Sequence, residues 1–377
     1  MKSLIPQIKT ALVLLITSLF IFGIIAAKQF LYPLAFGALF AYLLYPLVNF
    51  LEKNRFPRIL AILISILLAL AVIGITFFLF YKQLSNMFDN FEALKQSANN
   101  NIELLQKNLQ SFLDLKDNRL EQFLKTQVNY FFGSENSGLQ KAFSVTTGII
   151  LKLVLLPIYV FLFLYYRTKF AYFILKIVGK NRKKVTVNIL RDISTVAARY
   201  MGGVSIVVLI LCVLNSTGLL IIGVEYAILL GIISAFFNFI PYFGTILGGS
   251  VPMMFVLLTT NDPLHYALQV FILFVIIQFT ENNILTPNIV GGNVRINPFF
   301  IIVGLVLGGL IWGIPGMLII VPFLAIVRII LNHIDGLKPY AFLLGPKGTG
   351  KHSITMKKIK RNLNIREKIE KIFKKND

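Results

Sequence analysis

Charged side chains are scarce in this sequence, and acidic ones are the scarcest. Only 14% of the 377 residues are charged and 56% are hydrophobic, whereas roughly 25% of residues are charged in a typical soluble protein. A soluble fold of this length could not bury so much apolar side chain and would expose large apolar patches. The composition therefore excludes a soluble enzyme and a disordered chain, and it predicts an all-α, polytopic membrane protein.

Residues that form disulfides or bind metals are also rare. Cys212, the single cysteine, lies within an apolar run, so it can form no intrachain disulfide and is expected to act as a small hydrophobic residue. The three histidines, His265, His333 and His352, form no cluster with cysteine or carboxylate ligands along the sequence. We therefore expect no metal site and no cofactor.

Long apolar runs, by contrast, are abundant. A helix of about 20 mostly apolar residues spans a membrane, and the sequence contains six ordinary runs of this kind: Thr10–Ala27, Phe30–Phe50, Ile59–Phe80, Ile149–Tyr166, Gly202–Gly223 and Leu264–Thr280. The first run has the basic lead of a signal peptide. It is long for one, however, and ends in a poor cleavage site, which favours an uncleaved helix.

Two further apolar runs, 226–259 and 299–331, are too long for one straight helix. The segments before their interruptions are short, which favours re-entrant hairpins over full spans, although each run could also form two spans or one broken helix. The interrupting residues are Pro241, Gly244, Gly248 and Pro252 in the first run, and Gly313, Pro315, Gly316 and Pro322 in the second. Paired interruptions of this kind are typical of a transporter's binding site, but close helix packing explains many such glycines equally well.

The distribution of basic residues predicts the orientation in the membrane. The net charge is +21, and most of the excess lies in the loop 167–200 and in the tail after Gly336, so both belong in the cytoplasm together with the two termini. Segment 81–147 has balanced charges and is expected outside. The predicted organisation is therefore three spans in 1–80, an external helical arm in 81–147, a transmembrane core in 148–335 and a basic cytoplasmic tail in 336–377.

Two polar segments show helical periodicity. From Met87 to Phe112 apolar residues recur every three or four positions, which predicts an amphipathic helix. Its apolar stripe would pack either within a helical hairpin or on a neighbouring subunit. Segment 167–201 is also amphipathic and is expected to lie on the inner leaflet, with its basic residues 182–184 against anionic lipid. Lipid headgroups, and not nucleic acid, are likewise the expected partner of the basic tail.

Glu281 is the best candidate for a functional charge. Acidic residues at membrane depth are costly, so each is a functional candidate by default, and Glu281 ends one span just before Pro287 and Gly291. Arg295 follows closely enough to pair with it. We hypothesise that Glu281 takes up and releases a proton during transport. The alternative is an interfacial carboxylate that faces water or caps a helix.

Three amide side chains are candidate ligands for a polar solute or cation. Gln278 and Asn282 flank Glu281, and Asn238 precedes Pro241 in the first interrupted run. Asn238 could instead satisfy backbone groups that the proline leaves unpaired. Asn215–Thr217 form a polar band in the fifth span, where hydrogen bonds to neighbouring helices are the expected role.

Motifs of known catalytic sites are missing from the sequence. It has no serine-hydrolase elbow, no HExxH and no pair of aspartates at membrane depth. The segment 345–351 nearly spells a phosphate-binding loop, but His352 stands where a serine or threonine would hold magnesium. We therefore expect neither an enzyme nor a nucleotide-driven pump. Transport would then be driven by an ion gradient or be passive.

The run from Gln278 to Pro322 closely resembles the signature of the autoinducer-2 exporter family, also called PerM-like permeases. Upstream, FNFIPYFGTILGGSVP, which ends at Pro252, resembles the family's other motif. The matching positions are Asn238, Pro241, Gly244, Gly248, Pro252, Gln278, Glu281, Asn282, Leu285, Pro287, Gly291, Val294, Pro298, Gly309, Gly313, Gly316 and Pro322. Arg295 and Pro315 depart from the pattern. The resemblance covers most of the chain up to about Gly345.

This resemblance implies a bacterial inner-membrane secondary transporter. Members of the family are linked to export of the furanone signal autoinducer-2 or to sodium(lithium)/proton antiport. The resemblance also implies a homo-oligomer, with a pentamer as one form. A passive channel or an oligomeric membrane scaffold is the alternative from another class.

Overall fold

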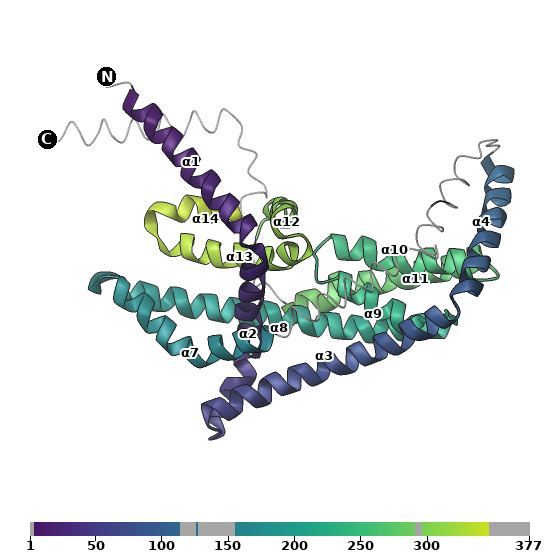
Figure 1. The fold of residues 1–377 in the computed structure, drawn as a ribbon, viewed down its shortest axis with the longest axis horizontal. Helices are drawn as coiled ribbons and strands as arrows, with labels where there is room; N and C mark the ends of the chain where they lie inside the picture. Colours follow the sequence, from purple (N-terminus) through teal and green to yellow (C-terminus); the bar gives the residue numbers. More distant parts are fainter. Residues whose placement is uncertain (1–3, 114–125, 127–154, 291–295, 347–377) are drawn as a thin grey trace.

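The computed structural model describes residues 4–113, 126, 155–290 and 296–346, and the regular elements in these ranges are helices, as predicted (Figure 1). The helices, in chain order, are α1 (Leu4–Ala26), α2 (Lys28–Lys53), α3 (Arg58–Asp89), α4 (Phe91–Leu113), α7 (Leu156–Ile177), α8 (Lys183–Ile222), α9 (Ala227–Phe237), α10 (Phe243–Thr259), α11 (Pro263–Thr280), α12 (Pro298–Trp312), α13 (Ile314–His333) and α14 (Lys338–Leu344). A π-helical segment, Glu281–Val290, follows α11 directly.

Within the described ranges, six helices are long and apolar enough to cross a membrane. These candidate spans are α2, α3, α7, α8, α11 together with the π segment, and α13. Many of their large apolar side chains are exposed, for example Leu67 and Phe78 on α3, at 63% and 64%. Apolar surface on this scale is unfavourable in water and favourable against lipid tails. The fold is therefore that of an all-α polytopic membrane protein.

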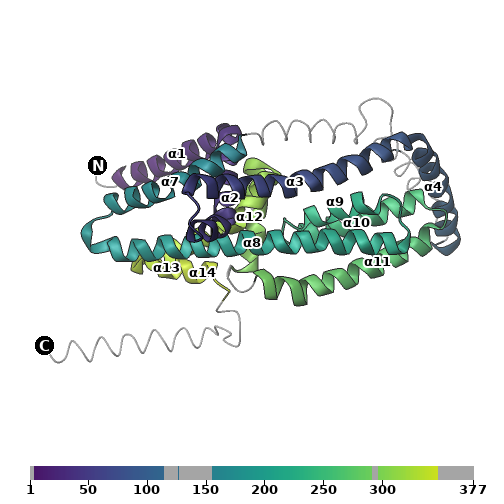
Figure 2. The same cartoon turned by 90° about the horizontal axis from the view of Figure 1, so that it is seen from below.

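α8 is the element around which the others are arranged. It runs along the long axis of the molecule in Figure 2 and contacts α2, α9, α11, the π segment and α13. Its 40 residues correspond to about 60 Å, roughly twice the thickness of the hydrocarbon core. The helix ends at Gly223, which has a φ of +86°, a left-handed conformation that glycine adopts without steric cost.

The first interrupted run forms two helices that pack as an antiparallel hairpin. α9 ends at Phe237 and α10 begins at Phe243, and Gly248 lies so close to α9 that a Cβ there would be 2.8 Å from the carbonyl oxygen of Ser234. Tyr242, just before α10, has a φ of +66°, a strained conformation for a bulky residue. The predicted break is therefore present, and it spans residues 238–242.

The second interrupted run also forms an antiparallel hairpin, with a tighter turn. Gly313, with a φ of +67°, separates α12 from α13, and Pro315 occupies the first turn of α13, where its missing N–H leaves no bond unmade. Gly308 and Gly316 bring the two backbones together, since a Cβ on Gly308 would lie 2.7 Å from the carbonyl oxygen of Gly316. Both functions proposed for these glycines, breaking and packing, are thus found in this hairpin.

Several of the residues expected to interrupt the apolar runs do not lie at a break. Pro252 and Pro322 sit inside α10 and α13, fully buried, and both helices continue through them. Gly248 is likewise inside α10, where it serves the close approach to α9. A single proline costs its helix one hydrogen bond, and burial against neighbouring helices evidently outweighs that loss. Pro287 lies within the π segment, and Gly291 falls outside the described residues.

The apolar stripe of the predicted external arm packs on its own chain. Met87, Leu94, Ala98 and Ile102 are buried in one cluster with Leu229 of α9, and Phe255 of α10 packs against the same cluster. Asn101 Nδ2 also donates to the carbonyl oxygen of Thr260, 2.8 Å away. Both predicted alternatives, a self-contained hairpin and a neighbouring subunit, are therefore wrong for this part of the stripe, because the first hairpin of the same chain covers it.

The predicted amphipathic helix over 167–201 is two helix ends joined by a turn. α7 continues to Ile177, beyond the predicted end of the fourth span at Tyr166, and α8 begins at Lys183 after a short 3₁₀ turn. Figure 2 shows this helical hairpin at one end of the molecule and α4 at the other. The prediction of one continuous helix is wrong, because α7 ends at Ile177 and the chain turns through Gly179 and the 3₁₀ segment before α8.

Candidate functional site

The π segment begins at the residue that the sequence marks as the functional charge. α11 ends at Thr280, and the ten residues from Glu281 to Val290 continue it with the wider π winding. π-helical stretches are rare and occur frequently at functional sites. Pro287 within the segment supplies no N–H, which is one local reason for the chain to leave the α-helical winding here.

Both carboxylate oxygens of Glu281 accept a hydrogen bond. Gln278 Nε2 donates to Oε2, and the Thr286 hydroxyl donates to Oε1 over 2.8 Å. All three side chains are half-buried. Hydrogen bonds to an ionised group are among the stronger ones in proteins, so this pair of donors fixes the orientation of the carboxylate. We refer to Gln278, Glu281 and Thr286 as the Glu281 site.

Thr286 was missed by the sequence analysis. It lies five residues after Glu281, whereas an α-helix brings residues three and four apart onto one face. The π winding, with its i→i+5 hydrogen bonds, places the fifth residue there instead. Gln278, three residues before Glu281, follows the α-helical rule and was predicted.

The two asparagines predicted as solute ligands occupy different places. Asn282 is exposed, and Asn238 is half-buried at the end of α9. In the part of the chain that the structure describes, neither hydrogen-bonds to Glu281, so their role as ligands of a solute stays a prediction. Arg295, the expected partner of Glu281, and Gly291 fall outside the described residues.

A hydrophobic cluster connects the Glu281 site with both hairpins. Ile277 and Val290, which flank the site, are buried together with Tyr200 of α8, Ala235 of α9 and Val321 of α13. Phe239, in the break of the first hairpin, packs against the same cluster. The interrupted helices and the π segment thus converge on the middle of α8.

A small residue lets the wide π segment approach α8. A Cβ on Gly203 would lie 2.9 Å from the Cα of Val290, which is closer than real Cβ atoms come to another backbone.

In the same helix, Asn215 is buried with its Oδ1 unpaired, and the Thr217 hydroxyl donates to the carbonyl of Val213 in its own helix. The expectation that this polar band bonds neighbouring helices is therefore wrong for Thr217.

A second polar cluster lies where α2, α3 and α7 meet. Arg167 of α7 donates to Glu52 at the end of α2, and Arg58, the first residue of α3, lies with its Nε 4.0 Å from the other oxygen of Glu52. Arg58 Nη2 also donates to the carbonyl of Leu164 over 2.8 Å. Because Glu52 and Arg167 are 115 positions apart, sequence periodicity could not pair them.

Replacing Glu52 by glutamine is expected to destabilise the fold. The change leaves two half-buried arginines without their shared counter-ion, and we expect the free energy of unfolding to fall by about 2 kcal/mol, below the value for a fully buried pair because this one is partly solvated. Thermal unfolding in detergent measures the effect. Glu92→Gln, an exposed carboxylate on α4, is the matched control, and equal melting midpoints for the two variants would contradict the prediction.

Ion pairs connect the end of α13 with its surroundings. His333 Nε2 lies 3.3 Å from Asp192 Oδ2 of α8, a contact that is ionic when the histidine is protonated. Lys338 Nζ lies 2.6 Å from Asp335 Oδ1, and this hydrogen bond, aided by the positive charge, lowers the pKa of Asp335.

Over the described ranges, no three His, Cys, Asp or Glu side chains gather as a metal site would require.

Comparison with known proteins identifies the family. The model of the AI-2E family of transporters matches residues 14–336. The chain belongs to the AI-2E transporter family. The matched range begins in α1 and ends in the 3₁₀ turn after α13, so it includes both hairpins and the Glu281 site. The AI-2E assignment confirms the resemblance seen in the sequence, and it makes the chain a member of a membrane transporter family.

Individual relatives agree with the AI-2E assignment. YrrI of Bacillus subtilis, described as a candidate transport protein, is 28% identical over 314 residues, which are 81% of this chain and 87% of YrrI. YueF of the same organism, described in the same words, is 28% identical over 81% of this chain and 84% of its own length. The AI-2 transport protein TqsA of Escherichia coli is 30% identical over 33% of this chain and 35% of its own.

Proposed function

We propose that this AI-2E family member is a secondary transporter that exports a small polar solute of the autoinducer-2 type, with Glu281 as its charge-carrying group. The observation that carries the proposal is the half-buried carboxylate of Glu281, held by Gln278 and Thr286 at the start of a π segment. Acidic residues within membrane-spanning segments are rare and are functional candidates by default.

The mechanism follows from what each part of the site can do. The two breaks place helix ends near the Glu281 site, and helix ends are where backbone groups can bind a polar solute in place of water. Glu281 takes up a proton or a cation on one side and releases it on the other. The hydroxyl of Thr286 and the amide of Gln278 hold the carboxylate in position in both states.

A second candidate is sodium(lithium)/proton antiport. The Glu281 site contains a carboxylate, a hydroxyl and an amide, which are the oxygen donors that small hard cations prefer. In that case a cation and a proton compete for the same carboxylate, and no organic solute is needed. A passive channel or an oligomeric scaffold is the third candidate, and an enzyme is not proposed because the chain belongs to a transporter family.

The membrane environment is part of the proposal. We place the chain in the bacterial inner membrane as a homo-oligomer, with a pentamer as one form, and with both termini in the cytoplasm. The excess of Lys and Arg in 167–200 and in the tail supports this orientation. The basic residues 182–184 and the tail would then contact anionic lipids.

Transport by the purified full-length protein in vesicles tests the proposal. Vesicles with an imposed pH gradient are supplied in turn with a labelled panel of small polar solutes, with sodium and with lithium. Saturable, pH-coupled flux of a polar solute is expected; cation flux alone would favour antiport instead. Single-channel currents in a planar bilayer would overturn a carrier mechanism, because a channel conducts many ions for each opening.

A further inference from the structure

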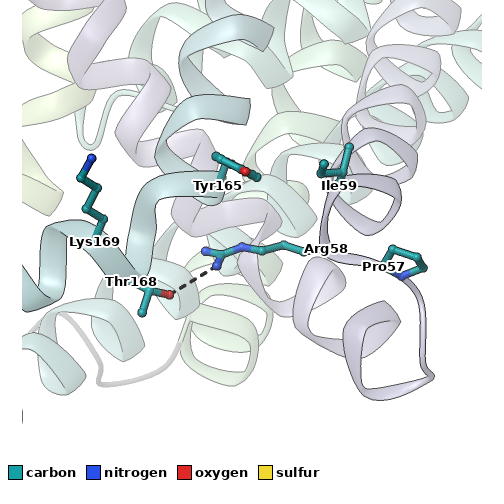
Figure 3. A pocket seen from close by; sticks show the side chains of 6 residues that line it. All are labelled: Pro57, Arg58, Ile59, Tyr165, Thr168 and Lys169. Carbon is teal, nitrogen blue, oxygen red and sulfur yellow. Dashed lines mark hydrogen bonds between the residues drawn. The ribbon is translucent and has the colours of Figure 1, made fainter.

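We propose that the cavity between the start of α3 and the middle of α7 binds the phosphate of an anionic phospholipid. The cavity measures about 500 Å³ and is lined by Pro57, Arg58, Ile59, Tyr165, Thr168 and Lys169 (Figure 3). We call it the α3–α7 cavity. It shares no residue with the Glu281 site, and among the described residues the basic segment 182–184 is not part of its lining.

The cationic side of the cavity is already organised by the fold. Arg58 reaches across to α7, where it donates to the Leu164 carbonyl over 2.8 Å. It also donates to the Thr168 hydroxyl over 3.4 Å, the bond drawn in Figure 3. Since Thr168 accepts this bond, its own O–H remains available to donate to an anion. The Nζ of Lys169 lies 5.6 Å from the ring centre of Tyr166, and the aromatic ring attracts the ammonium group electrostatically.

Charge around the cavity is not balanced within the protein. Among the described residues, Glu52 is the one carboxylate that forms ion pairs with the arginines beside the cavity. It already accepts a hydrogen bond from Arg167 and lies 4.0 Å from Arg58. Lys169 adds a further positive charge. Three cations against one carboxylate leave a local excess of +2, so an anion that binds here meets an attractive potential.

The depth and the walls of the cavity favour a lipid over a free anion. Arg58 is directly followed by Ile59 and Leu60, whose side chains are 49% and 50% exposed at the beginning of a candidate span, which places the cavity at the level of lipid headgroups. Tyr165, 37% exposed, is a residue type enriched at that level. The apolar walls of Pro57 and Ile59 suit the glycerol and upper acyl chain of a lipid and offer nothing to inorganic phosphate.

Native mass spectrometry of the full chain in detergent tests the proposal. The probes are phosphatidylglycerol and phosphatidylcholine with identical acyl chains, and inorganic phosphate. We expect tighter binding of phosphatidylglycerol, and an approximately fivefold weaker association for Lys169→Gln, as expected for one charge near a lipid headgroup. The double variant Arg58→Gln/Lys169→Gln should lose about 25-fold, because two independent effects add as free energies.

Lys176→Gln is the matched control. Lys176 is exposed on α7 two turns beyond Lys169, on the same helix face but outside the cavity, and its replacement should leave binding unchanged. Equal losses for the two single variants, equal binding of both lipids, or displacement of phosphatidylglycerol by inorganic phosphate would each overturn the proposal. Because Lys169 is exposed, its single variant stays informative even if the Arg58 double variant, checked by circular dichroism, fails to fold. The assay does not depend on the transported solute.

Discussion

Vesicles that contain the Glu281→Gln chain are expected to transport on the order of a tenth as fast as the wild type, or less, and to lose their response to a pH gradient. Glutamine keeps the size of the side chain but carries no charge and takes up no proton. Two hydrogen bonds to a carboxylate become bonds to a neutral amide, a loss that amounts to about tenfold or more in affinity or rate. Flux of the identified solute or cation, measured at several internal pH values, gives the result.

Glu92→Gln is the control for this experiment, because it removes an exposed carboxylate of α4 far along the chain from the Glu281 site. Undiminished flux that still follows pH in Glu281→Gln would remove Glu281 from the mechanism. Thr286→Val should have a smaller effect, about threefold, because it removes one of two donors, and Thr286→Ser should restore the rate. Failure of serine to restore it would assign Thr286 a packing role instead.

Gly244→Ala is expected to lower the free energy of unfolding by about 1–3 kcal/mol and to disrupt the first hairpin. A Cβ on Gly244 would overlap the carbonyl oxygen of Phe237 and the backbone of Asn238, so α9 and α10 would have to separate at the break. Both atoms belong to the backbone and cannot turn aside as a side chain can. Thermal unfolding and vesicle flux should therefore both decline.

Gly249→Ala in the same helix provides the comparison. Its Cβ would lie 3.6 Å from the ring of Phe274, an ordinary contact, and alanine stabilises a helix interior by up to about 1 kcal/mol relative to glycine. We expect this variant to be as stable as the wild type or more so. If both alanine variants melted at the same temperature, the close approach at Gly244 would not determine the stability of the hairpin.

A helix break that depends only on the backbone preferences of neighbouring residues could be predicted from the sequence. Gly313 and Pro315 mark the second break because their backbones favour a turn and then a helix start, and the structure breaks there. Pro252 and Pro322 were misplaced as hinges because the cost of a proline is weighed against burial, which a single segment of sequence does not reveal. The same limit applies to the predicted external arm, whose periodicity was clear but whose partner, Leu229, lies in another part of the chain.

The Glu281 site was only partly predictable for a different reason. Glu281 stood out by its charge and Gln278 by its helical spacing, but Thr286 joins them only through the π winding. Nothing in a single sequence distinguishes ten residues of π helix from ten of α helix, apart from the proline at 287. Asn238 was chosen because its amide precedes Pro241 in the first interrupted run, a position in the sequence that does not determine its distance from Glu281.

The length of α8 has a mechanical consequence. Thr186 near one end and Leu219 near the other are buried residues of the same unbroken helix, about 50 Å apart. A straight rod of that length converts a tilt of about 5° at one end into a displacement of about 4 Å at the other. A small movement of the α7–α8 hairpin would therefore act as a lever on the contact between Ser216 and Gly231, and so on the hairpin that contains the first break.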